Sequence, residues 1–173
     1  MKYELLTKEE FKTFYRILLN NFPRKEIKDY EYMEKTFFNG DYQILGLKDN
    51  DKIVGVLSFY QETDFYFIDY FAIDGSFKGK GTGSKMLQYF LDTYNKKVIL
   101  EVEHPQDDQS NRRIAFYKRN GLVLNDQFDY FVPPVRSLKE PLYFYLMSSK
   151  PIKDNQEFEK LYPRILKLVY SIE

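Results

Sequence analysis

A short segment rich in glycine and lysine, FKGKGTGSKML at residues 77–87, has the composition of a loop that binds a charged ligand. Its glycines alternate along the chain, at Gly79, Gly81 and Gly83. Removing every second side chain leaves main-chain N–H groups open to close approach. The apolar residues that follow have helical spacing, so the loop opens a helix, where unpaired N–H groups and the positive dipole end favour an anion. With nearby positive charge from Lys78, Lys80 and Lys85, the segment predicts a phosphate-bearing ligand.

Two common phosphate-binding motifs do not fit this loop. A nucleoside-triphosphate loop needs Gly, four residues and then Gly-Lys-Ser/Thr, but counting from Gly75 puts Lys80 where the second glycine belongs. A dinucleotide loop needs a third glycine after Gly-x-Gly, and the two possible alignments place Ser84 or Met86 there.

A third pattern does fit. The segment KGKGTG, residues 78–83, resembles the acetyl-CoA loop of the GNAT acetyltransferases, Arg/Gln-x-x-Gly-x-Gly/Ala, with Lys78 at the Arg/Gln position. The preceding IDYFAID (residues 68–74) is similar to the family's strand before the loop, and IAFYKRNGL (residues 114–122) is similar to its later helix. The family often has Asn seven residues before the tyrosine, where this chain has Ser110, with Asn111 one position out of register. The resemblance covers residues 1–148 and leaves residues 149–173 as an added amphipathic helix.

The resemblance implies that acetyl-CoA is the cosubstrate and that main-chain groups bind it. Six residues would give the amides that bind the diphosphate: Gly79, Lys80, Gly81, Thr82, Gly83 and Ser84. Main-chain groups of Phe71 and Ile73 would pair with the pantetheine amides as an extra strand does. An N–H near Ala72 or Ile73 would polarise the thioester carbonyl, and Lys78 would add positive charge.

The implied reaction is acetyl transfer to a primary amine by direct attack. The amine must lose a proton before it attacks, and the departing thiolate needs a proton or a hydrogen bond. By resemblance, Tyr117 is the candidate acid. For the base we favour Glu103, with four other candidates or a water chain as alternatives. Those candidates are Asp69, Glu101, Glu62 and His104.

The acceptor side is expected to come from the segment LKEPLYFYLM (residues 138–147) and the last helix. The segment includes Lys139, Glu140, Tyr143 and Tyr145. Its tyrosines either line an aromatic pocket for a cationic acceptor or pack in the core and rim. The last helix either packs on the domain or forms a homodimer interface. The alternative to an enzyme is a module that binds acetyl-CoA or CoA as a sensor, and a further rival is an interaction protein that keeps the glycine loop only as a turn.

Composition limits the other possibilities. The chain has 173 residues, 43% hydrophobic and 30% charged, which predicts one globular domain. Its 26 basic and 26 acidic residues cancel, so we expect no nucleic-acid partner. No cysteine is present and His104 is the single histidine, so no metal site is expected. Without a signal-like or membrane-spanning apolar run, we expect a soluble, cytoplasmic protein with no membrane partner.

The elements that position these residues alternate along the chain. A strand at residues 1–6 precedes a helix that starts in a capping box at Thr7 and stops before Pro23. A second helix (residues 25–38) ends at Gly40 and precedes three strands, at residues 42–49, 52–62 and 65–74.

The glycine-loop helix follows the third of these strands. After it come a buried strand (residues 96–103), a helix (residues 110–121), late strands (residues 130–134 and 142–149) and a final helix that Pro163 starts or kinks. The order predicts a mixed α/β fold with a mostly antiparallel central sheet. Its flanking helices surround a βαβ core with parallel pairing.

Overall fold

The computed structural model describes residues 1–135 and 139–173, and the chain divides into two compact units. Unit 1 contains residues 1–61 and 68–94, and unit 2 contains residues 62–67 and 95–173. Strand β4 (Phe65–Ile73) contributes residues to both units.

The strands of unit 1 follow the order β1-β2-β3-β4. Strands β1 (Lys2–Leu5), β2 (Tyr42–Asp49) and β3 (Lys52–Gln61) pair antiparallel, and for β2 and β3 the tight polar turn that joins them predicts this pairing. The tight turn between β2 and β3 uses Asn50 and Asp51 at φ of +49° and +68°. Short polar side chains tolerate this left-handed backbone better than other residues, which explains why the polar KDND sequence forms the turn.

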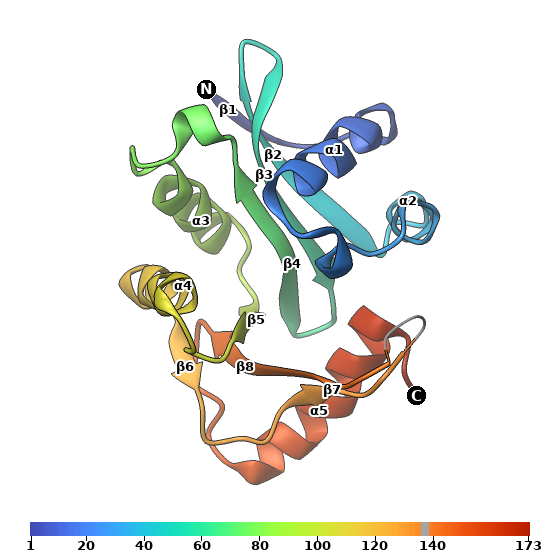
Figure 1. The fold of residues 1–173 in the computed structure, drawn as a ribbon, viewed down its shortest axis with the longest axis vertical. Helices are drawn as coiled ribbons and strands as arrows, with labels where there is room; N and C mark the ends of the chain where they lie inside the picture. Colours follow the sequence, from blue (N-terminus) through green and yellow to red (C-terminus); the bar gives the residue numbers. More distant parts are fainter. Residues whose placement is uncertain (136–138) are drawn as a thin grey trace. The chain divides into compact units, whose positions relative to one another are not determined.

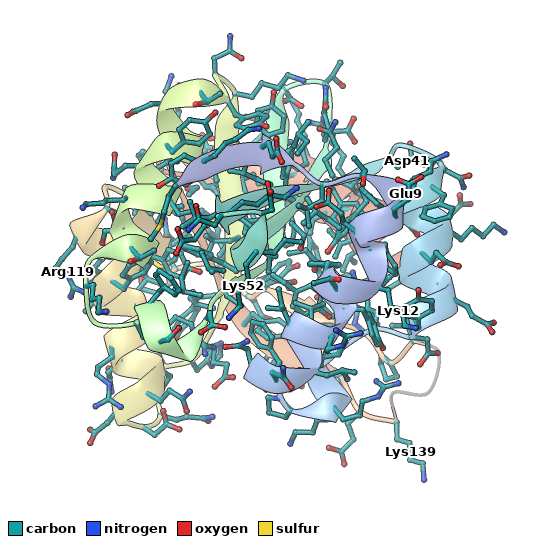
Figure 2. The ribbon with its side chains drawn as sticks, turned by 90° about the horizontal axis from the view of Figure 1, so that it is seen from above. Glu9, Lys12, Asp41, Lys52, Arg119 and Lys139 are labelled. Carbon is teal, nitrogen blue, oxygen red and sulfur yellow. The ribbon has the colours of Figure 1, made fainter. Side chains whose placement is uncertain are left out.

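Helices cover both sides of the unit 1 strands. The capping box at Thr7 is confirmed and starts the short helix η1 (Lys8–Glu10), which leads into α1 (Phe11–Asn21). After η2 (Arg24–Glu26) comes α2 (Tyr30–Phe38), and after η3 (Gly75–Phe77) comes α3 (Thr82–Thr93). Helices α1 and α2 lie on one side of β2–β4 and α3 on the other (Figure 1). Viewed from above, the exposed side chains of Glu9, Lys12 and Asp41 point outward on the α1–α2 side (Figure 2).

The second helix of unit 1 begins later than the sequence predicts. Residues 24–26 form η2, and Ile27 is extended at φ −102° and ψ 127°, so α2 starts only at Tyr30. The backbone here bonds outside the helix, because the Tyr70 hydroxyl donates to the Glu26 carbonyl and accepts from the Lys28 amide (2.8 and 3.2 Å). Tertiary hydrogen bonds replace the helical ones that local propensity favours.

The strands of unit 2 follow the order β5-β8-β6, with β7 also paired to β8. Strands β5 (Lys97–Glu103), β6 (Val123–Asn125) and β7 (Phe131–Val132) each pair antiparallel with β8 (Leu142–Ser148). We did not predict β6, whose short length carries almost no periodic signal. Helix α4 (Asp108–Arg119) precedes β6, as expected from its apolar spacing.

The C-terminal helix α5 (Asn155–Tyr170) belongs to unit 2 and runs beneath β7 and β8 in Figure 1. It starts at the Asp154 cap and continues through Pro163, so the expectation that Pro163 might start the helix is wrong. Its apolar face is buried, at Phe158, Leu161, Ile165, Leu166 and Val169. The Tyr162 hydroxyl also donates to the Phe131 carbonyl.

These observations confirm a mixed α/β fold with mostly antiparallel pairing, and the order β4, α3, β5 gives the predicted strand–helix–strand sequence. In the two ranges that the structure describes, five α-helices are present, and none is both long and apolar enough to cross a bilayer.

Candidate functional site

The glycine loop of unit 1 is open to a ligand. Gly79 and Gly81 have φ of +77° and +76°, a left-handed conformation that glycine adopts without steric cost. A Cβ atom built on either residue meets no other atom within 4 Å. The loop backbone is therefore accessible at both positions, as the alternating glycines predict.

Helix α3 begins without a capping side chain. Its N-cap is Gly81, which has no side chain and therefore makes no side-chain cap hydrogen bond. The first intrahelical bond runs from the Lys85 amide to the Gly81 carbonyl at 3.0 Å, so the amides of Thr82 and Gly83 precede the ladder. With the positive dipole end and the exposed Lys78 and Lys80, this start has the geometry and charge that an anionic diphosphate requires.

Strand β4 leads directly into this loop. The side chains of Ala72 and Ile73 are buried, and that of Phe71 is half-buried. The next amide, of Asp74, donates to the Val54 carbonyl at 2.8 Å. The Asp74 carboxylate accepts from the Ser76 amide at 2.9 Å and fixes η3. These local bonds hold the strand end and the first turn of the loop in place.

In unit 2, Tyr117 is buried on α4 with 8% of its surface exposed. No group in the described ranges hydrogen-bonds its hydroxyl. Burial raises the pKa of Tyr117 to about 12, although the charge of Arg113 acts in the opposite direction. The phenol is therefore protonated at neutral pH and has an O–H available for an external acceptor.

Glu103 ends strand β5 and is half-buried. Its Oε1 atom lies 3.8 Å from Nη1 of Arg113, one helical turn before Tyr117 on α4. Arg113 was not among the predicted site residues, although the spacing of four residues places it on the face of α4 that carries Tyr117. Arg113 thus influences both the candidate base and the candidate acid.

Two other candidate bases are already hydrogen-bonded to buried side chains. In unit 1, Asp69 Oδ2 accepts from the Tyr42 hydroxyl at 2.9 Å and lies 3.4 Å from Lys28 Nζ. In unit 2, Glu101 accepts from the hydroxyls of Tyr130 and Tyr170 at 2.5 and 2.7 Å. Both carboxylates therefore have hydrogen-bond partners within the fold. They differ in this from Glu103, whose carboxylate lies 3.8 Å from Arg113.

The remaining candidates lie in unit 2. Glu62 Oε1 is 4.0 Å from Arg164, and His104 stacks on Tyr145 with ring centroids 4.0 Å apart. Neither arrangement indicates a specific proton transfer. The described ranges contain no group of three or more His, Cys, Asp or Glu side chains that could hold a metal ion.

Ser110 and Asn111 both serve the start of α4. The Asp107 carboxylate accepts from the Ser110 amide at 2.8 Å, and the Ser110 hydroxyl accepts from the Asp107 amide at 3.1 Å. The Asn111 side chain donates to the Asp107 carbonyl at 2.8 Å. The spacing of Asp107 and Ser110 forms a capping box, a signal in the sequence that we did not predict.

The expected acceptor segment is partly exposed. Residue 138 lies outside the described residues, whereas Lys139, Glu140 and Tyr143 are exposed. Tyr145 is half-buried against His104.

Comparison with known proteins identifies the family. The sequence profile described as "Acetyltransferase (GNAT) family" matches residues 7–122. The chain is 31% identical over 108 residues to "Putative acetyltransferase YjbC" of Bacillus subtilis (strain 168), a match that spans 61% of this chain and 54% of YjbC. The chain therefore covers about half the length of that relative.

Solved structures share the fold. "Putative acetyltransferase from GNAT family from Bacteroides thetaiotaomicron" covers both chains fully with a TM-score of 0.89 at 23% identity. Arabidopsis thaliana Naa50, in complex with the bisubstrate analogue CoA-Ac-MVNAL, has a TM-score of 0.62 at 18% identity, over 87% of this chain and 99% of that one. At these identities the likeness concerns the fold alone.

Proposed function

Since this chain belongs to the acetyltransferase (GNAT) family, we propose that it transfers the acetyl group of acetyl-CoA to a primary amine. The observation that carries the proposal is the start of α3, where a glycine loop with positive φ opens a helix whose N-cap, Gly81, has no side chain. Naa50, which has the same fold, binds a bisubstrate analogue that contains CoA.

The cosubstrate is bound mainly by main-chain groups of unit 1. The amides of residues 79–84 bind the diphosphate, and Lys78 adds positive charge beside it. Main-chain groups of Phe71 and Ile73 pair with the pantetheine amides, and the N–H of Ala72 or Ile73 polarises the thioester carbonyl. The open space around Gly79 and Gly81 supports this assignment, because a ligand must approach the backbone closely there.

The reaction needs two proton movements. The neutral amine attacks the thioester carbonyl carbon and forms the new C–N bond, and the nitrogen then loses a proton as the C–S bond breaks. Tyr117 donates its phenolic proton, or a hydrogen bond, to the departing CoA sulfur. Its hydroxyl suits this role because it is protonated at neutral pH and has no hydrogen-bond partner in the part of the chain that the structure describes.

The proton that leaves the amine is taken by Glu103 or passes through water to bulk solvent. Glu103 is half-buried, and Arg113 at 3.8 Å keeps a positive charge beside it. Asp69 and Glu101 accept hydrogen bonds from buried tyrosines. Of these three carboxylates, Glu103 therefore has the weakest contacts with the rest of the fold. An unchanged pH–rate profile in Glu103→Gln would remove it from the mechanism.

The test combines binding with turnover. Calorimetry with acetyl-CoA and with CoA measures binding, and a thiol reagent measures CoA release against a panel of amines that includes peptides, polyamines, amino acids and aminoglycosides. Amine-dependent release supports an N-acetyltransferase. Binding without release from any amine instead supports a CoA sensor, and no binding overturns both.

A further inference from the structure

A buried ionic cluster in unit 1 joins the segment before α2 to strand β4. The Lys28 Nζ lies 3.4 Å from Asp69 Oδ2 and 2.9 Å from the Tyr60 hydroxyl. The two charged side chains are only 11% and 9% exposed. The Tyr42 hydroxyl donates to the same Asp69 oxygen at 2.9 Å. Asp69 is thus held by an ammonium and a phenol, both from other elements of the unit.

The backbone of the same segment is tied down as well. The Tyr70 hydroxyl donates to the Glu26 carbonyl and accepts from the Lys28 amide. On the other side of Lys28, the Tyr15 hydroxyl donates to its carbonyl at 2.8 Å. Residues 24–29, which we call the pinned segment, are therefore fixed through both main-chain and side-chain groups.

The ammonium of Lys28 stays charged in this environment. Burial by itself lowers the pKa of Lys28, but the Asp69 carboxylate and the Tyr60 hydroxyl raise it above its ordinary value. A buried ion pair adds little net stability, because the desolvation of both charges offsets their attraction. Removing one partner is nevertheless harmful, since it leaves the other charge buried and unpaired.

The pair acts on the strand that binds the cosubstrate in the proposed function. Asp69, Phe71 and Ile73 alternate along β4, so neighbouring members of this series are about 7 Å apart. A movement of the pinned segment that pulls on Asp69 therefore reaches the main-chain groups assigned to pantetheine.

We propose that Lys28 is a positioning residue, which uses Asp69 as its counter-ion to fix the pinned segment on β4. Asp69 consequently takes no proton from the acceptor amine, although its place in the sequence made it a candidate base. The inference rests on the proposed function for its effect on turnover. The fixation of the segment itself does not depend on that function.

Hydrogen exchange tests the fixation without any ligand. In Lys28→Met, the amides of residues 26–29 are expected to exchange at least about tenfold faster than in the parent, while those of the α3 interior keep their rates. Lys25→Met is the matched control, because Lys25 is an exposed lysine in the same segment. Unchanged exchange at residues 26–29 in Lys28→Met would overturn the proposal.

The variant Lys28→Met/Asp69→Asn covers the case in which the single variant does not fold. It removes both charges, while the introduced amide oxygen can still accept from the Tyr42 hydroxyl. The same acceleration at residues 26–29 is expected in this variant, and its absence counts equally against the proposal.

Kinetics separate positioning from proton transfer. In Asp69→Asn, KM for acetyl-CoA is expected to rise about tenfold and kcat to change less, with the limbs of the pH–rate profile unmoved. Lys28→Arg, which keeps the charge, should retain a lower KM than Lys28→Met. If one limb of the pH–rate profile disappears in Asp69→Asn, Asp69 acts as the base and the proposal is overturned. If the parent protein neither binds acetyl-CoA nor releases CoA, the proposed function fails, and hydrogen exchange still decides the role of Lys28.

Discussion

Helices α3 and α4 begin in opposite ways. Before α4, the Asp107 carboxylate accepts from the Ser110 amide, and the Ser110 hydroxyl accepts from the Asp107 amide, so the first turn is satisfied within the chain. Before α3 stands Gly81, which has no side chain and a φ of +76°. Every α-helix has a positive N-terminal end. When a carboxylate of the chain already accepts from the first-turn N–H groups, few of these donors remain for an external anion. The proposed diphosphate site rests on this difference between the two starts rather than on the dipole alone.

The largest effect is expected from a substitution that adds a side chain at the start of α3. Gly81→Val is expected to weaken acetyl-CoA binding by at least about a hundredfold, because a β-branched side chain resists positive φ and covers the loop amides. Calorimetry measures the affinity and thermal unfolding measures the accompanying strain.

A second glycine in unit 1 provides the control for that variant. Gly40 has φ of +87° and, like Gly81, has no atom within 4 Å of a built Cβ. Gly40→Val should therefore show a similar loss of thermal stability with normal acetyl-CoA affinity. Equal losses of affinity in both variants would show that the α3 start does not bind the cosubstrate.

The next largest effect is expected at Tyr117, which lies on the capped helix α4. Tyr117→Phe is expected to lower kcat about tenfold to a hundredfold, because a thiolate is a fair leaving group and acid assistance is then worth less than usual. Acetyl-CoA affinity should stay within about twofold, since the proposed diphosphate site is the start of α3 and not Tyr117. Tyr143→Phe, at a tyrosine that is 58% exposed, is the control, and an unchanged kcat in Tyr117→Phe would remove the acid role.

A smaller effect is expected at the capped start of α5. The Asp154 carboxylate accepts from the Glu157 amide at 2.9 Å. Asp154→Ala should lower the free energy of unfolding by about 1 kcal/mol, the usual contribution of an N-cap. Denaturant unfolding measures the loss. Acetyl-CoA affinity should not change, and a parallel loss of affinity would contradict the division into binding and structural helix starts.

The smallest effect is the pH dependence of the α4 cap. The Ser110 amide and hydroxyl lower the pKa of Asp107 below its ordinary value. Because the folded pKa is depressed, the cap stabilises the protein at neutral pH, and this contribution is lost as the pH falls through the ordinary and then the folded pKa. Asp107→Asn keeps an acceptor that does not titrate.

The melting temperature of the parent relative to Asp107→Asn should therefore fall between about pH 6 and about pH 3. A difference that is constant over this range would show that the carboxylate charge contributes nothing to the cap.

Most elements could be predicted because their signals are local. Strand β2 has the predicted bounds of Tyr42–Asp49, and the capping box at Thr7 has the predicted partner, Glu10. The glycine loop is also local, and its two left-handed residues have the backbone conformation that the glycines suggested. The cosubstrate and catalytic roles assigned to individual residues stay predictions, which the experiments above address.

The signals that failed were non-local or too short. The start of α2 depends on hydroxyls from Tyr15 and Tyr70, the latter far along the chain from Lys28. Strand β6 is defined by its pairing with β8 rather than by its own pattern. Lys28 lies within the predicted second helix (residues 25–38), and no feature of the neighbouring sequence indicates a buried counter-ion.

The sequence by itself determined most of the segments that become helices and strands, and the place where a glycine loop opens a helix. These properties follow from backbone conformation and from the spacing of apolar side chains over a few residues. Only the tertiary structure decided which carboxylates have partners. Asp69 and Lys28 are 41 positions apart in sequence, and the charge state and availability of such groups depend on distances that folding alone sets.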